Sequence, residues 1–290
     1  MDPIYLQVFF GGLTAGSIYA MIALGFTLVY RATTVINFAH GEFVMLGALL
    51  AITGVTSLKL PLAVAVVLAI AVTAVIGILF ERVLLQPVHR QPAFVLILIT
   101  VGASFFFRGA AMIIWGKEPL PLPAFSGNQS IMLAGAAILP QVVWILAAAV
   151  LTVVALSLFL NRTVYGKALR ACAENPGAAS LVGINVSAMV MLSFLISAGI
   201  GGLAGVLIAP VTGMDFQAGF LLAMKGLTGA IIGGLERVTG VIVGGLMLGL
   251  IEAYGAAFVS SLMKDALAFV VLIVVLMVWP NGLLGARTTR

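Results

Sequence analysis

Residues 166–185 read GKALRACAENPGAASLVGIN, and this polar stretch interrupts a chain that is otherwise apolar. Long hydrophobic runs end just before it and resume just after it, so it must lie in water between two membrane spans. Asn175 is a favourable N-cap, Pro176 suits the first helical position, and Gly183 can adopt the left-handed conformation that ends a helix. The stretch therefore predicts a short, stiff helix on the membrane surface.

One face of this helix is apolar. Ala178, Leu181 and Val182 fall at positions i, i+3 and i+4, which lie on one side of a helix. Such a face could dock on another protein, although an ordinary capped linker has the same spacing. Asn185 is placed to cap the next span, and the single cysteine, Cys172, is expected to report which side of the membrane the segment occupies.

The composition identifies a polytopic helical membrane protein. Of the 290 residues, 63% are hydrophobic and 8% are charged, and the mean hydropathy is +1.26. Soluble domains are about 45–50% apolar and about 25% charged. The short alternating segments of a transmembrane β-barrel are missing from the sequence. The fold class is therefore predicted to be all-α, with residues 1–290 forming a single transmembrane domain.

Nine apolar segments are candidates for membrane spans, which need about 20 residues each. They are 7–30, 38–58, 61–80, 93–115, 138–160, 187–209, 217–234, 239–259 and 265–280. The seventh follows Asp215 and contains Lys225, so it is the candidate for a broken or re-entrant helix. We expect about eight or nine transmembrane segments and a short cytoplasmic helix within residues 162–185.

The basic residues are distributed unequally about these spans. Four fall on or near one side, Arg108 lies within a span, and nine fall on the other side. The nine are Arg31, Arg82, Arg90, Arg162, Lys167, Arg170, Arg237, Arg287 and Arg290. Because cytoplasmic loops are rich in Lys and Arg, the amino terminus is expected outside and the carboxyl terminus in the cytoplasm. The net charge of +5 therefore reflects topology and not nucleic-acid binding, and the proline-rich loop 116–139 is expected to form a rigid outer lip.

Many glycines occur four residues apart. The pairs are Gly12 and Gly16, Gly201 and Gly205, Gly229 and Gly233, Gly240 and Gly244, and Gly245 and Gly249. Small residues at this spacing let helix backbones approach closely in lipid. The spacing predicts a compact bundle and is not specific to one function.

Sequence motifs for catalysis are missing. The chain contains neither a P-loop nor a dinucleotide-binding fingerprint, and its two histidines are far from each other and from the cysteine. No metal site, cofactor or catalytic residue is therefore expected.

The most polar cluster near a span is INFAHGE, residues 36–42. Asn37 is expected to cap the following helix, and Glu42 lies near the positive end of that helix. His40 and Glu42 are two residues apart and so do not share a helix face. The cluster is either a helix start at the membrane boundary or a polar element beside a transport path.

Two further ionisable residues lie within spans. Arg108 and Glu252 are each expected about 10 Å below the outer boundary, from a rise of about 1.5 Å per residue. An unpaired charge at this depth is costly. The two are expected to be partners or to line one wet cavity.

Five blocks together resemble the LivH-type permeases, the inner-membrane subunits of ABC importers for branched-chain amino acids. The blocks are INFAHGE (36–42), ERVLLQPVHR (81–90), GKALRACAENPGAASLVGIN (166–185), AGFLLAMKGLTGAIIGGL (218–235) and WPNGLLG (279–285). The resemblance runs nearly end to end, and the combination is specific. It implies a multi-pass subunit of the bacterial inner membrane that moves leucine, isoleucine, valine or related small amino acids and amides.

The resemblance also implies partners. These would be a LivM-type permease as a heterodimeric partner, two cytoplasmic ATPase subunits that hydrolyse ATP, and a periplasmic substrate-binding protein. The chain itself would not be an enzyme, would bind no nucleic acid and would contact the lipid bilayer.

The implied sites fall in two groups. The residues implied to couple to the ATPases are Glu174, Asn175, Pro176, Gly177, Ala178, Leu181 and Gly183. The candidates for the translocation path are Asn37, His40, Glu42, Arg108 and Glu252. Two alternatives are a urea or short-amide ABC permease, which resembles this family closely, and an ATP-independent secondary transporter with Glu42 and Glu252 as ion-coupling carboxylates.

Overall fold

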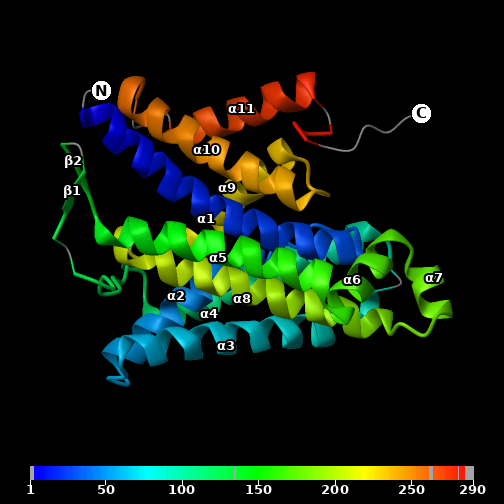
Figure 1. Cartoon of the computed structure of the whole chain (residues 1–290). Helices are drawn as coiled ribbons and strands as arrows, with labels where there is room; N and C mark the ends of the chain where they lie inside the picture. Colours follow the sequence, from blue (N-terminus) through cyan, green and yellow to red (C-terminus); the bar gives the residue numbers. More distant parts are fainter. Residues whose placement is uncertain are drawn as a thin grey trace.

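The computed structural model describes residues 3–89, 91–127, 129–133, 135–260, 264–279 and 281–284. Each of the nine candidate spans corresponds to one helix of a bundle (Figure 1). These helices are α1 (Pro3–Thr33), α2 (His40–Thr56), α3 (Leu62–Phe80), α4 (Ala93–Trp115), α5 (Pro140–Arg162), α8 (Val186–Thr212), α9 (Ala218–Gly233), α10 (Val238–Phe258) and α11 (Lys264–Val278).

Within the described residues, six helices are long and apolar enough to cross a membrane, judged by length and composition. They are α1, α3 with its extension to Val88, α4, α5, α8 and α10. The helices α2, α9 and α11 are apolar but shorter, with 17, 16 and 15 residues. The chain is therefore a multi-pass helical membrane protein.

The seventh segment, predicted as the candidate for a broken or re-entrant helix, has no break, and whether it is re-entrant stays a prediction. The helix α9 runs without interruption from Ala218 to Gly233, and Lys225 lies within it. Asp215 precedes the helix and accepts hydrogen bonds from the backbone N–H groups of Gln217 and Ala218, at 2.8 and 2.7 Å. Asp215, one of the two charged residues that suggested a break, therefore stabilises the start of α9.

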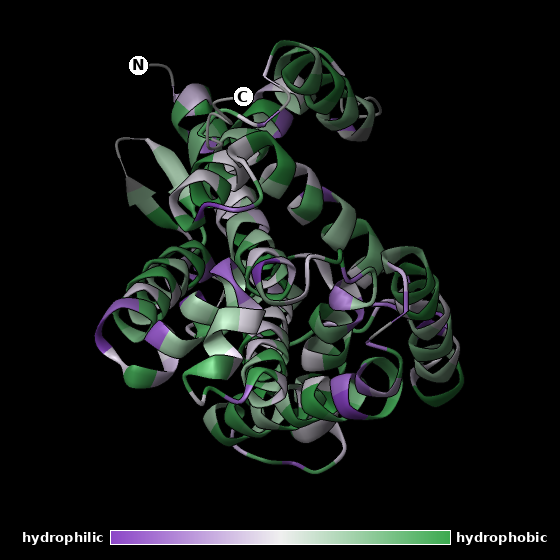
Figure 2. Ribbon diagram, turned by 90° about the vertical axis from the view of Figure 1, so that its right-hand side faces the viewer, coloured by the Kyte–Doolittle hydropathy of each residue, from purple (hydrophilic) through white to green (hydrophobic). Residues whose placement is uncertain are grey.

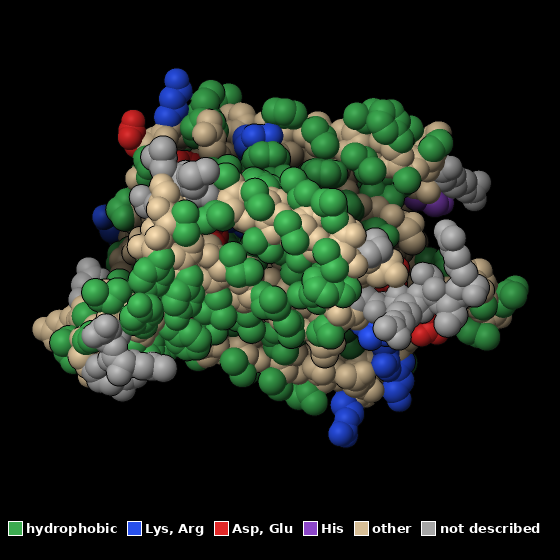
Figure 3. Space-filling view, turned by 90° about the horizontal axis from the view of Figure 1, so that it is seen from above, with side chains coloured by type: hydrophobic (Ala, Val, Ile, Leu, Met, Phe, Trp, Pro, Cys, Tyr) green, Lys and Arg blue, Asp and Glu red, His purple; other side chains and the backbone are tan. Residues whose placement is uncertain are grey.

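The centre of the bundle is α1. Almost every residue from Gly16 to Val29 is buried, as expected for a helix that is apolar on all sides. It packs on α10, α8 and α9, and it passes between the α5–α8 layer and the α10–α11 layer in Figure 1. Hydrophobic side chains cover the outer face seen in Figure 3, with charged side chains toward its margins, as expected of a surface that contacts lipid.

The glycine pairs lie where helices touch, which confirms the predicted close packing. A Cβ atom on Gly16 of α1 would lie 2.8 Å from the Leu246 Cα atom of α10. A Cβ atom on Gly229 of α9 would lie 2.9 Å from the Gly245 Cα atom of α10. Only hydrogen fits at these positions, so glycine brings α1, α9 and α10 into backbone contact.

The loop 116–139, which was predicted to lie outside, contains two strands that the all-α prediction missed. Strand β1 (Ile131–Leu133) pairs antiparallel with β2 (Ala136–Ile138), and Ile131 lies opposite Ile138. Leu120 and Met214 exchange two backbone hydrogen bonds of 2.9 Å, which join this loop to the segment between α8 and α9. The loop is therefore tied to the bundle at the end where the amino terminus lies (Figure 1).

The opposite end carries two short helices, α6 (Val164–Glu174) and α7 (Pro176–Leu181). Figure 2 looks onto this end and shows hydrophilic stretches among hydrophobic helices. Of the nine basic residues predicted on one side, Arg90, Arg287 and Arg290 lie outside the described residues. The others lie in α6 or at the ends of α1, α3, α5 and α10 that meet here.

The contact between α1 and α10 predicts a position-specific effect on stability. Gly16→Val would force branched methyl groups into the backbone of α10, and overpacking of this kind costs about 1–3 kcal/mol. We expect a lower thermal unfolding midpoint for the detergent-solubilised protein. Gly102→Val on α4 is the matched control, because no atom lies within 4 Å of a Cβ atom there and the helix propensity changes equally. Equal midpoints for the two variants would contradict the packing.

Candidate functional site

The connection between α1 and α2, residues 34–39, starts at the exposed Thr34 and enters the bundle, where Val35, Asn37 and Ala39 are buried. The Phe38 N–H donates to Thr100 Oγ1 at 3.2 Å, and Thr100 lies two turns into α4. His40 Nδ1 lies 3.1 Å from the Ser197 Oγ atom, in the middle of α8. The helix α2 therefore begins within the protein. Irregular backbone at membrane depth is tolerated only when it is buried in protein or lines a cavity.

The backbone of this connection is unusual at its start. Thr34 has a φ of +58°. A β-branched residue rarely adopts the left-handed region, and such conformations persist only where surrounding structure holds them. The hydroxyl of Thr33 accepts a hydrogen bond from the Val35 N–H at 3.3 Å, which holds the chain on either side of Thr34.

Asn37 lies at the inner end of the connection and is buried. Its Oδ1 atom accepts a hydrogen bond from the Ala39 N–H at 3.0 Å, so it forms a turn before α2. The N-cap of α2 is Ala39, which makes no side-chain cap bond, so the prediction that Asn37 caps this helix is wrong. The Asn37 Nδ2 atom has no hydrogen-bond partner among the described residues.

His40 and Glu42 point to different neighbours, as their spacing predicted. The His40 ring contacts Ser197 and packs edge-on against Phe26, with ring centroids 4.7 Å apart. The Ser197 hydroxyl also donates to the Gly25 carbonyl at 3.0 Å. His40 thus links α2 to α1 and α8 and takes no part in a joint site with Glu42.

Glu42 forms a buried polar cluster with α4. Its Oε1 atom accepts a hydrogen bond from Ser104 Oγ at 2.7 Å and lies 3.5 Å from Arg108 Nε. The Arg108 guanidinium lies over the rings of Phe105 and Phe220, 4.6 and 4.8 Å from their centroids. The cluster therefore joins α2 to α4, and Phe220 brings in α9.

A pocket of about 240 Å³ opens beside Arg108. Its lining includes Phe105, Met112, Phe216 and Gln217, from α4 and the start of α9. The guanidinium thus stands between this pocket and the fully buried Glu42. Arg108 is placed to meet a polar group that enters from the pocket.

Glu252 belongs to a different cluster, so the predicted pairing of Arg108 with Glu252 is wrong. Its Oε1 atom contacts the Lys225 ammonium of α9, and its Oε2 atom accepts a hydrogen bond from the Tyr19 hydroxyl of α1 at 2.7 Å. Equal depth along two helices did not place the side chains on facing sides. The cluster ties α9 and α10 to α1.

The polar partners of these residues could not be identified from the sequence. Ser104, Ser197 and Lys225 complete the three clusters, and each lies within an apolar helix. A lone hydroxyl in an apolar helix is too common to be singled out from spacing. Lys225 did stand out, but its partner could be identified only from tertiary structure.

The short helix α7 is capped as predicted. The Asn175 Oδ1 atom accepts the Ala178 N–H at 2.9 Å, and Gly183 has a φ of +86°. The Gly183 N–H bonds to the Ser180 carbonyl and the Ile184 N–H to the Ala179 carbonyl, both at 3.1 Å. This pair of bonds is the Schellman arrangement that ends a helix at a glycine.

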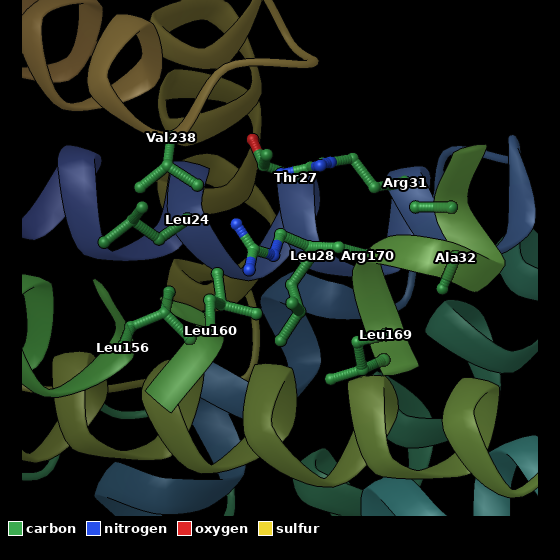
Figure 4. Close-up of a pocket in the computed structure, with 11 residues that line it drawn as sticks. Leu24, Thr27, Leu28, Arg31, Ala32, Leu156, Leu160, Leu169, Arg170 and Val238 are labelled. Carbon is green, nitrogen blue, oxygen red and sulfur yellow. The ribbon is translucent and has the colours of Figure 1, made fainter. Parts of the chain in front are cut away.

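The preceding helix, α6, was not predicted and is packed against the bundle. Its buried residues are Gly166, Leu169 and Cys172, and Figure 4 shows Leu169 beside the space between α1 and α5, into which Arg170 extends. Arg170 also donates to the Asn161 side chain at 2.9 Å. Cys172 is buried, and this burial raises the pKa of its thiol, so a labelling reagent would reach it slowly from either side; its use as a reporter of sidedness stays a prediction.

The helix α7 exposes the residues that were predicted to form its apolar face. Leu181 is 89% exposed and Val182 is 77% exposed, whereas Ala179 is buried against the protein. Leu181 and Val182 therefore form an exposed apolar pair at the end of the bundle that carries α7. Asn185 caps α8 as predicted, accepting the Ala188 N–H at 3.0 Å.

The two ion-pair clusters predict which double substitutions are coupled. Lys225→Met and Glu252→Gln should be strongly non-additive in their effect on stability, because either one alone leaves a buried charge without its partner, at a cost of about 3–5 kcal/mol. Arg108→Met and Glu252→Gln should be additive to within about 0.5 kcal/mol, because they act in separate clusters. Chemical unfolding in detergent measures both cycles. Coupling in the second cycle as large as in the first would contradict the assignment.

Among the described residues, no group of three His, Cys, Asp or Glu side chains is placed to hold a metal ion. The polar side chains of the three clusters form interhelical contacts and one pocket wall. These are arrangements for binding and for holding helices in position.

Known proteins are similar in sequence to this chain over almost its full length. Residues 8–276 match the family described as "Branched-chain amino acid transport system / permease component". The permease protein LivH of Escherichia coli K12, from a high-affinity branched-chain amino acid transport system, is 36% identical over 97% of this chain and 96% of its own length. BraD of Pseudomonas aeruginosa, from a system of the same description, is 35% identical over the same shares.

The fold is also similar to a solved structure, PsaBC from Streptococcus pneumoniae in complex with Fab, with a TM-score of 0.50 at 9% identity. That similarity covers 97% of this chain and 93% of the other. The match over residues 8–276 and the identity of more than one third decide the assignment. This chain belongs to the family of permease components of branched-chain amino acid transport systems.

Proposed function

We propose that this chain is a membrane-spanning subunit of an ABC importer that moves leucine, isoleucine, valine or related small amino acids into the cell. The observation that carries the proposal is the capped helix α7, which holds Leu181 and Val182 in water at the end of a buried bundle. Membership of the permease family supports the same role.

The proposal includes a topology and a set of partners. Residues 1–290 form one permease domain with eight or nine spans, including α2, α9 and α11, with the amino terminus outside and the carboxyl terminus in the cytoplasm. A LivM-type permease forms the second half of the pore, two ATPase subunits bind on the cytoplasmic side, and a periplasmic protein delivers substrate. The chain hydrolyses no ATP and uses no cofactor.

The segment 162–185 is the coupling element in this proposal. The helix α6 is fixed to α5 because Gly166 packs directly on the backbone at Phe159 and Leu160, where a Cβ atom would not fit. A force applied to α7 is therefore passed to the bundle through α6. The ATPase contact comprises Glu174, Asn175, Pro176, Gly177, Ala178, Leu181 and Gly183, all of them exposed.

The translocation path in this proposal begins at the pocket beside Arg108 and passes the connection between α1 and α2. Arg108 meets the substrate's carboxylate, Glu42 holds Arg108 in place, and Asn37 and His40 border the inner part. Glu252 acts differently, because with Lys225 it fixes α9 against α1 and α10. ATP binding moves the bundle by favouring one of two arrangements of these helices.

The proposal predicts that the chain transports nothing by itself. Reconstituted alone in liposomes, it should give no leucine uptake above empty vesicles, with or without an ion gradient, because it has no ATPase of its own. Co-reconstitution with the second permease, the ATPases and the binding protein should give uptake that requires ATP. Gradient-driven uptake by the chain alone would support a secondary transporter and refute this proposal.

The coupling segment predicts a graded mutation series. Gly183→Val places a β-branched residue at a φ of +86° and should uncouple ATP hydrolysis from transport. Leu181→Asp puts a charge on the docking face and should be worse. Lys167→Gln is the control, because a single exposed charge contributes little.

The measurement is the number of leucine molecules moved per ATP hydrolysed, with assembly checked by co-purification of the second permease. Both variants should assemble with that permease. Wild-type coupling in Leu181→Asp would exclude α7 as the docking helix.

A further inference from the structure

A cavity of about 270 Å³ lies at the end of the bundle that carries α7. It is enclosed by α1, the segment after α3, α4 and α8, and most of its wall is apolar, including Leu85, Leu96 and Phe194. Pockets for drug-sized ligands measure about 300–1,000 Å³, so this one suits a smaller molecule. It is separate from the pocket beside Arg108.

Two buried polar residues line this cavity, and one side-chain atom of each lacks a hydrogen-bond partner among the described residues. Glu81 is 3% exposed and Asn37 is 2% exposed, and both line the cavity. Glu81 Oε2 and Asn37 Nδ2 have no hydrogen-bond partner within the described part of the chain. Buried polar groups are almost always hydrogen-bonded, so each such atom requires an explanation.

The two atoms have opposite hydrogen-bonding character. A carboxylate oxygen only accepts and an amide nitrogen only donates. Arg82 and His89 act on Glu81 electrostatically, but neither donates a hydrogen bond to its Oε2 atom. A ligand that suits both atoms must carry a donor, preferably cationic, and an acceptor, preferably anionic.

The backbone around Glu81 is adapted to place it there. Residues Glu81–Leu85 form a short π-helix that follows α3 directly, and π-helical turns occur frequently at functional sites. The side chain of Gln86 donates to the Ser187 hydroxyl at the start of α8, which joins the segment after α3 to α8.

We propose that this cavity is an inner subsite for an α-amino acid with a branched apolar side chain, and that the Glu81 and Asn37 side chains turn toward the cavity so that Glu81 binds the ammonium and the Asn37 amide binds the carboxylate. The side chain packs against Leu85, Leu96 and Phe194. This assignment rests on the proposed function and adds a second substrate position on the cytoplasmic side of the bundle. Charged donor and acceptor pairs make the strongest hydrogen bonds, so both ends of a zwitterion are recognised.

The same cavity touches the coupling segment. Pro176, the first residue of α7, is part of its lining. A displacement of α7 by a partner therefore changes the cavity wall directly. Substrate release and movement of the coupling helix are linked at this residue.

The test measures equilibrium binding to the purified permease–ATPase complex without the binding protein. Three probes separate the contacts: L-leucine, 3-methylbutylamine, which lacks the carboxylate, and 4-methylpentanoate, which lacks the ammonium. Glu81→Gln should lower the affinity for leucine and for 3-methylbutylamine by at least about tenfold, because both carry the ammonium that Glu81 binds. The affinity for 4-methylpentanoate should not change. Asn37→Ala should lower the affinity for leucine and for 4-methylpentanoate, which carry the carboxylate. The affinity for 3-methylbutylamine should not change.

Glu118→Gln is the matched control, because it removes an exposed carboxylate from the outer loop. It should leave all three affinities unchanged, and thermal unfolding establishes that Glu81→Gln is folded. Unchanged leucine affinity in Glu81→Gln, or an equal loss for all three probes, would overturn the subsite. ATP-driven leucine uptake by the wild-type transporter would then leave the proposed function standing, whereas failure of that uptake would refute the proposed function itself.

Discussion

The helix α2 begins inside the bundle, and its start has to satisfy its polar groups with protein atoms. The Ala39 N–H bonds to Asn37, and the Phe38 N–H bonds to Thr100 on α4. Gly41 packs on the backbone of Gly219 in α9, where a Cβ atom would not fit. These contacts fix α4 and α9 around one point, and His40 adds α1 and α8. Irregular backbone within a helical membrane bundle is tolerated only where protein atoms or a lined cavity satisfy its polar groups, so these contacts constrain the arrangement of the other helices.

Two buried ion pairs also fix the relative positions of the helices. The pair Glu42–Arg108 joins α2 to α4, and the pair Lys225–Glu252 joins α9 to α10 with Tyr19 of α1 as a third member. Pairs of this kind add little net stability, but losing one member is costly. Glycine contacts permit the close approach of α1, α9 and α10, and the ion pairs select one arrangement from those that glycine allows.

The sequence predicted what depends on neighbours along the chain. The positions of the apolar helices and the caps at Asn175 and Gly183 follow from hydrophobic length and local hydrogen bonding, and the structure contains these helices and caps. Prediction from the sequence failed where contacts between distant segments determine which side chains meet. Equal depth suggested that Arg108 and Glu252 pair, but depth says nothing about the direction in which a side chain points.

Other features were missed for the same reason. Cys172 lies in a polar segment, yet α6 folds back and buries it, and Glu81 fell just outside a predicted span although it lines a cavity. The strands β1 and β2 have three residues each, which is too short for an alternating pattern to show.

Because Asn37 and Pro176 line one cavity, we expect water to reach the connection between α1 and α2 from the end of the bundle that carries α7. A single-cysteine variant Asn37→Cys, in a Cys172→Ser background, tests this in inside-out vesicles that carry the complete transporter. We expect it to react with a small charged thiol reagent at a rate that changes when ATP is trapped. The lipid-facing variant Phe106→Cys, at a position 70% exposed on the protein surface, should not react. An Asn37→Cys variant as unreactive as Phe106→Cys in every nucleotide state would contradict the account.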